Sequence, residues 1–387
     1  MVTGTRIVNA LVNGELADIV VADGVIAGIS DAGSGSAAEA AFDAGGRAVL
    51  PGFVDCHTHA CFAGTRLDEW ERKLAGVSYL DLLEQGGGIM ATVRATREAS
   101  ETELTELLLA RLTRMLAHGS TTVEVKSGYG LDTESELKML RAIARAGESF
   151  AGTVVPTACI GHAIDPEVEH GRFVRRTIDE TLPAVTAEFP GIALDAYCEK
   201  GAWSLDDCLA LFAAGQAAGH PIRVHADQFN ALGMIEAAVE LGFASVDHLE
   251  ATGIEGLDRL ATSTAFGVML PASGFHLDER YGDGRAFLDA GGRLALGTNY
   301  NPGSAPCWSM PFVVALAVRK LGLTPAEAVH ASTAAGAELL GLSDRGKIEP
   351  GMRADLVVLD ATDARELAFE FGGNPVARVM AGGQGTR

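Results

Sequence analysis

The chain has 387 residues, of which 48% are hydrophobic, and its formal net charge is −21 at pH 7. This length and apolar content predict a large core, built as one α/β barrel with a small accessory domain or as two to three ordinary domains. The negative charge argues against nucleic acid and anionic membranes as partners, and no apolar run of about 18 residues is present to cross a bilayer.

The N-terminal residues Met1–Arg6 have neither the basic nor the apolar region of a signal peptide. The six cysteines form no CxxC pair and lie in apolar contexts, so we expect reduced, mostly buried thiols and a cytoplasmic protein. Cys56 and Cys61 flank two histidines, and for these two thiols buried packing is favoured over metal ligation.

Both ends of the chain have the pattern of short β-strands. Residues 5–49 contain short apolar runs with Gly-rich turns, and residues 345–387 contain the apolar run Leu356–Leu359. Each end is too short to bury a core alone. We therefore predict a composite β-sandwich domain, formed by residues 1–49 together with residues 345–387.

The segment Val54–Cys56 runs directly into His57 and His59. Side chains two apart in a strand point to the same face, so both imidazoles can reach one metal ion. An isolated pair of this kind more often consists of two ordinary strand-end histidines. Motifs in the remainder of the chain favour the metal site instead.

Residues 50–344 alternate β-branched apolar runs with amphipathic helical stretches. Apolar residues recur at helical spacing from Leu104 to Leu116, and Gly119 follows as a stop signal. A further helix is predicted to begin at Thr133, with Glu136 three residues later as in a capping box. Besides the strand before His57, seven strands are expected, at 121–125, 153–157, 194–198, 222–225, 245–248, 266–270 and 294–297.

Eight β-α units indicate an α/β protein with a TIM-type (β/α)8 barrel as the catalytic domain, over residues 50–344. An open, doubly wound sheet is the alternative. Polar residues gather at the expected carboxyl ends of the barrel strands, where such barrels carry their active sites. His225 and His248 both stand where a strand gives way to a loop. Imidazoles from several separate regions suit a metal such as zinc or ferrous iron.

The segment Leu50–His59 resembles the entry strand of the metal-dependent amidohydrolase superfamily. Within it, the chain resembles the family of imidazolonepropionases, in segments that follow the order of the barrel: Cys61–Arg66, Gly86–Ile89, Glu124–Leu131, His225–Gln228, Asp247–Glu250 and Asn301–Ser304. The Lys-Ser-Gly-Tyr-Gly and Asn-Pro-Gly-Ser sequences in these segments are the most specific. The resemblance implies hydrolysis of the cyclic amide 4-imidazolone-5-propanoate to N-formimidoyl-L-glutamate in histidine degradation, by a homodimer with one Zn²⁺ or Fe²⁺ per chain.

The resemblance also implies a role for each matching residue. The metal ligands would be His57, His59, His225 and the residue at position 299. The substrate contacts would be Arg66, Tyr79, Tyr129, His162, Gln228, Asn301, Gly303 and Ser304. Catalysis would involve Gln228, His248 and Asn299. Independently, a small anionic substrate calls for a cation, and Arg66 lies in the loop at the barrel mouth; viewed alone, it also fits a solvated surface arginine.

Position 299 departs from the family pattern, which carries an aspartate there, whereas this chain has Asn299. An asparagine offers a carbonyl oxygen as a ligand, but it is neutral and cannot act as a base. We expect weaker metal binding and transfer of the proton to another group, with His248 as the first candidate. A compensated natural variant, a chain of altered activity and an engineered substitution are all compatible with Asn299, and the intact substrate contacts favour a working enzyme.

Two alternatives remain. The same barrel supports deamination of a purine or related ring, although such a neutral ring gives Arg66 no carboxylate to bind. A non-catalytic barrel that acts as a binding protein is the other alternative, and only Asn299 supports it. Lys126 is predicted to have a structural ion-pair role, because the sequence around it matches a family with one metal.

Overall fold

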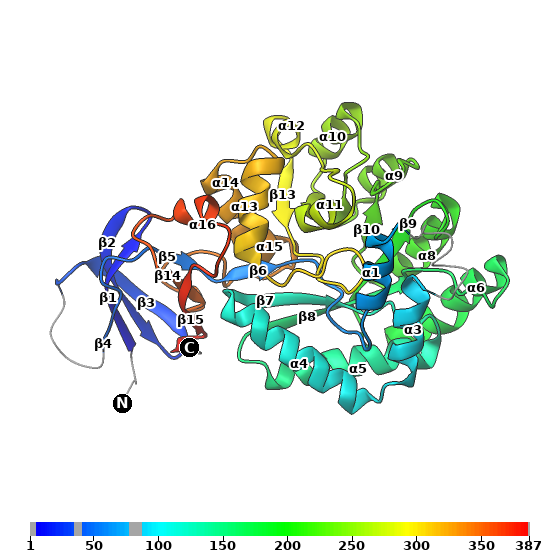
Figure 1. Ribbon diagram of the computed structural model, residues 1–387, viewed down its shortest axis with the longest axis horizontal. Coiled ribbons are helices and arrows are strands. Elements are labelled where there is room, and N and C mark those ends of the chain that lie inside the picture. Colours follow the sequence, from blue (N-terminus) through cyan, green and yellow to red (C-terminus); the bar gives the residue numbers. More distant parts are fainter. Residues whose placement is uncertain (1–4, 35–40, 77–86, 386–387) are drawn as a thin grey trace.

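The computed structural model of the chain describes residues 5–34, 41–76 and 87–385. A ring of strands surrounded by helices forms the larger part of the molecule (Figure 1). A smaller group of strands lies at one side of the ring, and both ends of the chain are there. Tyr79 and Gly86, which the sequence singled out, lie outside the described residues.

Eight parallel strands form the ring. In order of pairing they are β6 (Phe53–Asp55), β7 (Ser120–Lys126), β8 (Thr153–Gly161), β9 (Ala193–Cys198), β10 (Arg223–Ala226), β11 (Ser245–His248), β12 (Phe266–Met269) and β13 (Arg293–Leu296). Just beyond β6 and β13, the backbone of Asn299 donates to His57 O at 2.9 Å and that of His59 donates to Tyr300 O at 3.0 Å. These bonds join the first strand to the last, so the predicted barrel is confirmed and the open sheet is wrong.

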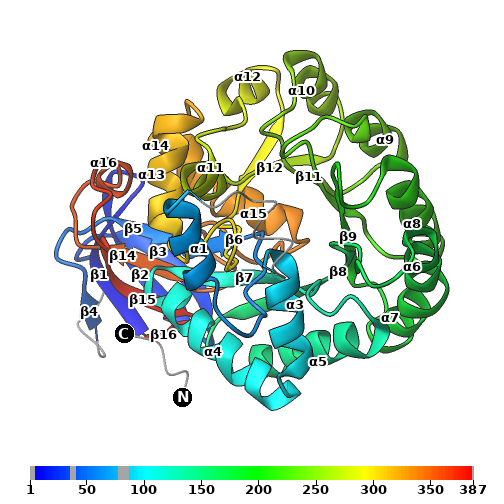
Figure 2. The same cartoon turned by 45° about the vertical axis from the view of Figure 1, so that its right-hand side comes forward.

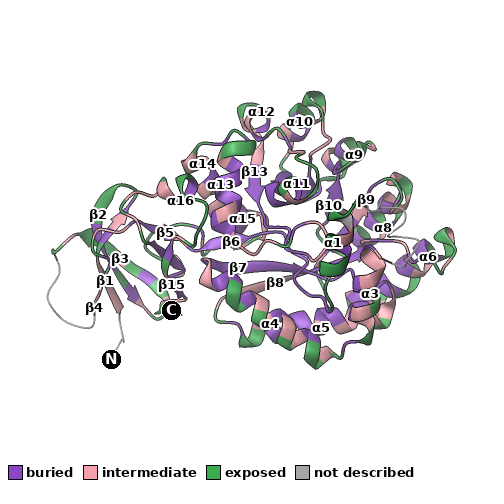
Figure 3. Cartoon of the chain, viewed as in Figure 1, coloured by how far each residue is buried: buried purple, intermediate pink, exposed green. Residues whose placement is uncertain are grey.

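Helices cover the outside of the ring (Figure 2). Since both faces of each strand are covered, the strands are mostly buried, and every residue of β7 is buried (Figure 3). The described helices are α1 (Leu67–Leu74), α3 (Ile89–Glu98), α4 (Glu101–Ala117), α5 (Thr133–Ser149), α6 (His170–Arg176), the π-helix η1 (Thr177–Thr181), α7 (Leu182–Glu188), α8 (Leu205–Ala217), α9 (Met234–Leu241), α10 (Ile254–Ala261), α11 (Pro271–Leu277), α12 (Gly284–Asp289), α13 (Met310–Lys320), α14 (Pro325–Ala331), α15 (Ala334–Leu339) and α16 (Glu366–Phe369).

The two helices predicted individually are present. α4 ends at Ala117, and Gly119 beyond it has a φ of 93°, in the region that favours glycine. α5 begins at Thr133 as predicted, but the predicted capping box is wrong. Asp132 is the N-cap and accepts a hydrogen bond from Ser135 N at 2.8 Å. Glu136 turns toward the preceding loop instead, where backbone N–H groups need an acceptor.

Two four-stranded sheets form the smaller part. The first contains β3 (Val25–Asp31), β2 (Glu15–Ala22), β1 (Thr5–Val12) and β4 (Ala41–Asp43), and the second contains β16 (Gln384–Gly385), β15 (Val376–Ala381), β14 (Leu356–Leu359) and β5 (Val49–Pro51). Apolar side chains of both sheets, such as Ile19 and Leu356, form one buried cluster. The predicted β-sandwich built from both termini is therefore confirmed, and we propose residues 1–49 with 345–387 as its extent.

The chain passes from the sandwich into the barrel at Gly52, between β5 and β6. The backbone N–H of Gly52 donates to Asp355 O at 2.8 Å, immediately before the strand β14, which pairs with β5. A Cβ atom at this position would lie 2.1 Å from Thr121 Oγ1 of β7. Only glycine fits at this junction without a shift of its neighbours.

The six cysteines are free thiols, five of them buried and Cys307 partly buried. Cys56 Sγ lies 3.3 Å from Leu296 O, and Cys61 Sγ lies 3.9 Å from Met139 O, so both pack as expected. Among the described residues, the helices include none with the length and hydropathy needed to cross a bilayer.

Candidate active site

Three of the four expected strand-end histidines form a compact cluster at the carboxyl end of the barrel. His57 and His59 follow β6, and His225 lies in β10. One ring nitrogen from each can be chosen such that all three lie within 4.8 Å of one another, and all three residues are buried. His59 Nε2 and His225 Nε2 are 2.9 Å apart. The barrel therefore brings together the three histidines predicted as metal ligands.

Buried carboxylates orient two of these rings. His57 Nδ1 lies 2.6 Å from Asp247 Oδ2, and His225 Nδ1 lies 2.8 Å from Asp195 Oδ1. An ionised carboxylate only accepts, so each Nδ1 carries the proton and each Nε2 has a free lone pair. Burial lowers the pKa of all three histidines, which keeps them neutral and able to ligate a cation.

The carboxylates belong to a buried ion network below the histidines. Lys126 Nζ lies 2.8 Å from both Glu124 and Asp195, and Arg223 lies 2.7 Å from Asp247. Burial and the charge of Arg223 would lower the pKa of Lys126, but the neighbouring carboxylates outweigh them and raise it. The structural role predicted for Lys126 is confirmed. The network holds three carboxylates and two cations, so its surplus negative charge favours a bound cation nearby.

Asn299 lies beside His57 across the seam between the first and last strands. Its Nδ2 donates to Ser273 Oγ at 2.7 Å, and its backbone N–H donates to His57 O. Its Oδ1 is buried and, like His57 Nε2, has no hydrogen-bond partner among the described residues. Unpartnered buried polar atoms of this kind are what a missing ligand leaves behind, so the residues fit a metal.

Two predicted substrate contacts, His162 and Tyr129, stand against this cluster. The His162 ring stacks on that of His59, with ring centres 4.6 Å apart and planes 13° apart, and Tyr129 lies 5.2 Å from His162. Burial lowers the pKa of His162 to about 4. Since its Nδ1 donates to Gly128 O at 2.9 Å, its Nε2 is left as an acceptor for a ligand.

Tyr129 is presented by a loop that Glu136 of α5 holds from behind. The Glu136 carboxylate accepts hydrogen bonds from the backbones of Gly128, Gly130 and Leu131, at 2.9, 2.7 and 2.9 Å. Glu136 is 1% exposed. This interaction fixes the loop on which one substrate contact stands, and it explains why Glu136 does not cap its own helix.

Arg66 is already engaged in an ion pair. Its Nε donates to Glu69 Oε2 at 2.6 Å, and its Nη2 donates to Glu69 Oε1. A Cβ atom at Gly303 would lie 3.0 Å from Arg66 Nη1, so this end of the guanidinium faces the 301–304 turn.

Asn301 builds that turn from within. Its Oδ1 accepts from the backbones of Gly303 and Ser304 at 2.8 and 2.7 Å, and its Nδ2 donates to Asn299 O and Ser304 Oγ at 2.7 and 2.9 Å. With these bonds made, the Asn301 side chain shapes the turn that contains the predicted substrate contacts Asn301, Gly303 and Ser304.

His248 and Gln228 complete the set at this end of the barrel. The His248 ring centre lies 5.6 Å from that of His225 and 6.0 Å from that of His57, and its Nδ1 lies 3.1 Å from Glu250. Gln228 Oε1 accepts from the hydroxyl of Tyr197 at 2.8 Å. His248 has a φ of 97°, and Asn299 a φ of 52°. Such backbone strain in non-glycine residues is typical of functional sites.

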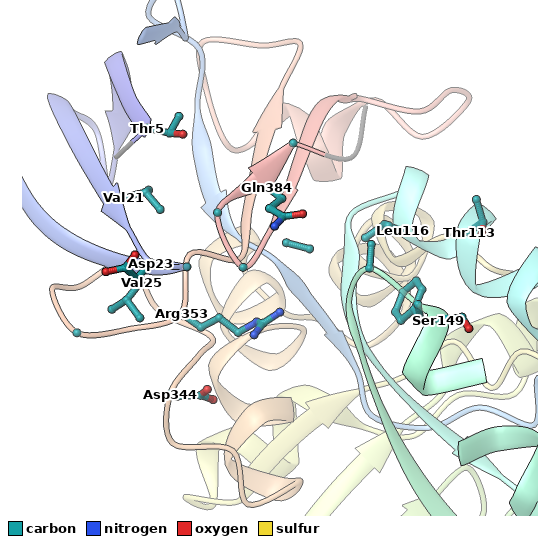
Figure 4. Close-up of a pocket in the computed structure, with 18 of the residues that line it drawn as sticks. Thr5, Val21, Asp23, Val25, Thr113, Leu116, Ser149, Asp344, Arg353 and Gln384 are labelled. Atoms are coloured by element: carbon teal, nitrogen blue, oxygen red, sulfur yellow. The ribbon is translucent and has the colours of Figure 1, made fainter. Parts of the chain in front are cut away.

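Two cavities are present among the described residues, and the histidine cluster lines neither of them. One of about 1120 Å³ lies where the sandwich meets the barrel, with Asp23 and Arg353 on one side and Leu116 and Ser149 on the other (Figure 4). None of the described candidate site residues lines it. A second cavity, of about 610 Å³, has Arg66, Glu69 and Gly303 in its wall. The candidate active site is therefore identified by its buried polar groups, because the cavity of about 1120 Å³ does not contain them.

Sequence reasoning missed the carboxylates that position the site: Asp195, Asp247, Glu69 and Glu136. For Asp195 and Asp247 a signal exists, because each is an ionisable residue within an apolar strand and needs a buried partner there. Glu69 and Glu136 lie on amphipathic helices, where a glutamate is ordinarily solvated.

Comparison with known proteins agrees with this geometry. The amidohydrolase family pattern matches residues 48–385. The imidazolonepropionase of Deinococcus radiodurans is 45% identical over 371 residues, which cover 96% of this chain and 92% of that protein. The imidazolonepropionase of Herpetosiphon aurantiacus is 45% identical over 361 residues, 90% of this chain and 84% of that protein.

Solved structures share the fold at lower identity. The 5-methylcytosine deaminase of Klebsiella pneumoniae liganded with 5-fluorocytosine superposes with a TM-score of 0.79 at 18% identity, over 99% of this chain and 97% of that chain. The N-isopropylammelide isopropylaminohydrolase of Burkholderia multivorans has a TM-score of 0.76 at 19% identity, over 99% and 98% of the two chains. At this identity they support the fold alone. The family pattern and the close relatives place the chain in the amidohydrolase family, a superfamily of metal-dependent enzymes, and within it among the imidazolonepropionases.

Proposed function

We propose that this chain hydrolyses 4-imidazolone-5-propanoate to N-formimidoyl-L-glutamate, a step of histidine degradation. The observation that carries the proposal is the position of His162 and Tyr129, two implied substrate contacts, against His59 of the histidine cluster. The close relatives named imidazolonepropionase support the same substrate. The deaminase alternative has only the distant structural neighbours in its favour.

The reaction consumes one water molecule. The oxygen of that water bonds to the ring carbonyl carbon, and the bond from this carbon to the ring nitrogen breaks. The carbon becomes a carboxyl carbon, and the nitrogen takes a proton. The residues must therefore bind the ring, accept a proton from the water and return one to the nitrogen.

One divalent cation, Zn²⁺ or Fe²⁺, is proposed as the cofactor. His57, His59 and His225 would hold it through neutral imidazoles, with Oδ1 of Asn299 as an uncharged fourth donor. When bound, such a cation polarises a carbonyl group and lowers the pKa of water toward neutrality.

Proton transfer is assigned to His248. Its Nδ1 faces the Glu250 carboxylate at 3.1 Å, which leaves Nε2 for the reacting groups. Asn299 cannot take this role because an amide has no basic site at neutral pH. Gln228, held by Tyr197, is proposed to contact the ring together with His162 and Tyr129.

The remaining assignments follow from charge and chemistry. The propanoate makes the substrate a small anion, and Arg66 is proposed to receive it together with the turn that contains Gly303 and Ser304. Tyr79 is kept as a further contact. The buried free thiols support a cytoplasmic location, and family resemblance supports a homodimer. With a net charge of −21, no nucleic acid or membrane partner is proposed.

An assay of ring opening combined with metal analysis tests the proposal. Protein loaded with Zn²⁺ or Fe²⁺ should bind about one ion per chain, consume imidazolonepropanoate and release N-formimidoylglutamate, detected by mass spectrometry. His57→Ala should lose both the ion and the turnover. A loaded protein that leaves the imidazolone intact, or that releases ammonia from an aminopyrimidine instead, would contradict it.

A further inference from the structure

We propose that Glu69 is a positioning residue for Arg66, which makes the guanidinium offer only its Nη1 end to the carboxylate of the substrate. Gly303 is the second part of this arrangement, because its lack of a side chain leaves room for that end. The inference rests on the proposed function, in which Arg66 receives the propanoate. Glu69 itself is not expected to touch the substrate.

The Glu69 carboxylate occupies one full edge of the guanidinium. Its two oxygens accept from Nε, at 2.6 Å, and from Nη2 of Arg66. Both side chains are about one-tenth exposed, so water competes little for these bonds. A two-point pair of this kind fixes the plane of the guanidinium as well as its position.

Glu69 is itself held in place. Its Oε2 also accepts from the backbone N–H of Gly88 at 2.8 Å, immediately before α3. Glu69 lies near the start of α1, so this bond joins the first turn of α1 to the residue that precedes α3. The Glu69 carboxylate is therefore held in a fixed position, whereas in a solvated surface ion pair both side chains are mobile.

The free end of the guanidinium lies against the 301–304 turn. A Cβ atom at Gly303 would lie 3.0 Å from Arg66 Nη1, closer than side chains ordinarily approach. Asn301 Oδ1 holds the Gly303 backbone at 2.8 Å, so the turn cannot move away readily. A ligand carboxylate thus meets one fixed end of Arg66, at a position set by Glu69 on one side and by the turn on the other.

This arrangement predicts selectivity for the length of the chain that joins the ligand's carboxylate to its ring. A fixed single end of a guanidinium accepts a carboxylate at one distance from the ring, whereas a mobile guanidinium follows chains of several lengths. The negative charge of Glu69 also offsets that of Arg66 before the ligand arrives. Correct placement, more than net charge, should therefore govern binding of the propanoate.

Binding of unreactive analogues to the full-length, metal-loaded protein tests this inference without turnover. Imidazole-4-propanoate, imidazole-4-acetate and imidazole are titrated by calorimetry. The unmodified protein should bind the propanoate most tightly. Glu69→Ala should weaken that binding roughly ten- to hundredfold, the scale of hydrogen bonds between charged groups, and should bring propanoate and acetate close together. Imidazole should bind equally in both forms.

Further variants separate positioning from general damage to the fold. Asp68→Ala removes the same charge from an exposed neighbour on the same helix and should leave all three affinities unchanged. Glu69→Gln keeps one acceptor and should restore part of the propanoate affinity, and Gly303→Ala should weaken it. In an Arg66→Ala background, Glu69→Ala should have no further effect.

Several results would overturn the inference. They are unchanged propanoate affinity in Glu69→Ala, an equal effect of Glu69→Ala with and without Arg66, and the absence of any carboxylate preference in the unmodified protein. If the unmodified protein shows the predicted preference but does not open the imidazolone ring, the proposed function fails and the role of Glu69 stands.

Discussion

At the scale of single residues, Asn299 gives the proposed set of metal ligands a neutral fourth donor in place of an anionic one. Its Nδ2 is bonded to Ser273 Oγ, and its Oδ1 is buried without a partner among the described residues. A carboxylate here would keep the contact with Ser273, because a hydroxyl can donate as well as accept. It would also add negative charge beside the cation site and supply a base.

We therefore expect Asn299→Asp to raise metal affinity and to raise kcat for ring opening by about 10²–10⁴-fold, the usual contribution of a general base. Metal titration and steady-state kinetics measure the two effects. Asn374→Asp, an exposed position in the sandwich region, is the matched control and should change neither. Equal metal content and equal rates at position 299 would show that His248 already carries the whole proton transfer.

Asp247 determines which nitrogen His57 offers. Its carboxylate accepts from His57 Nδ1 at 2.6 Å and from Arg223 at 2.7 Å. In Asp247→Asn the amide can present a donor to Nδ1, which would move the proton to Nε2 and remove a ligand. We expect a 10- to 100-fold loss of metal affinity, the usual effect of losing such a partner. Competition with a chelator measures it. Asp206→Asn on the surface should behave like the unmodified chain, and unchanged affinity at 247 would refute the role.

At the scale of elements, the loop before α5 depends on a helix residue for its shape. Glu136 accepts three backbone N–H groups of the loop, and His162 donates to Gly128 O on its other side. Tyr129 lies between these bonds. The two predicted contacts Tyr129 and His162 are therefore held by the same short segment.

Glu136→Gln should loosen this loop, because its NH2 group would face backbone donors and leave some of them unpaired. Each lost bond to the charged acceptor is worth about 1.5–3 kcal/mol. Hydrogen exchange at residues 128–131 should become faster, and KM should rise more than kcat falls. Glu134→Gln on the exposed face of the same helix serves as the control. Unchanged exchange in the loop would count against the argument.

The sequence predicts the elements well where burial alone determines them. The eight barrel strands contain apolar residues because helices cover their outer face and the barrel interior covers their inner face, and this pattern is visible without the structure. The sequence alone does not determine the N-cap of α5, since Asp132 and Thr133 are both good capping residues. The histidines are predictable from their strand-end positions. That Asp195 and Asp247 need buried partners is visible too, but their pairing with His225 and His57 is not, because pairing across strands depends on the register of the closed barrel.

At the scale of the whole molecule, the chain passes from the sandwich into the barrel at Gly52. Its backbone is bonded to Asp355 of the sandwich, and its Cα faces Thr121 of the barrel. β5 and β6, on its two sides, belong to different sheets. Packing at this one residue therefore affects both parts.

Gly52→Ala should lower stability by about 1–3 kcal/mol, the usual effect of overpacking, because the new Cβ would lie 2.1 Å from Thr121 Oγ1. Denaturant unfolding followed by fluorescence and circular dichroism measures this change. Gly28→Ala in β3 is a suitable control, since a Cβ there has no atom within 4 Å. A Gly52→Ala protein as stable as the Gly28→Ala protein would show that the junction relaxes without loss.

The seam that closes the barrel has a consequence for protein synthesis. Asp55 accepts from the backbone of Thr298 at 2.9 Å, across 243 positions of sequence. At the 5–20 residues per second of translation, His57 and His59 leave the ribosome roughly 10 to 50 s before the strand that completes their surroundings. A nascent chain that ends just before that strand already contains all three histidines of the cluster, with an open barrel edge beside them. The barrel that surrounds the cluster can thus close only near the end of synthesis.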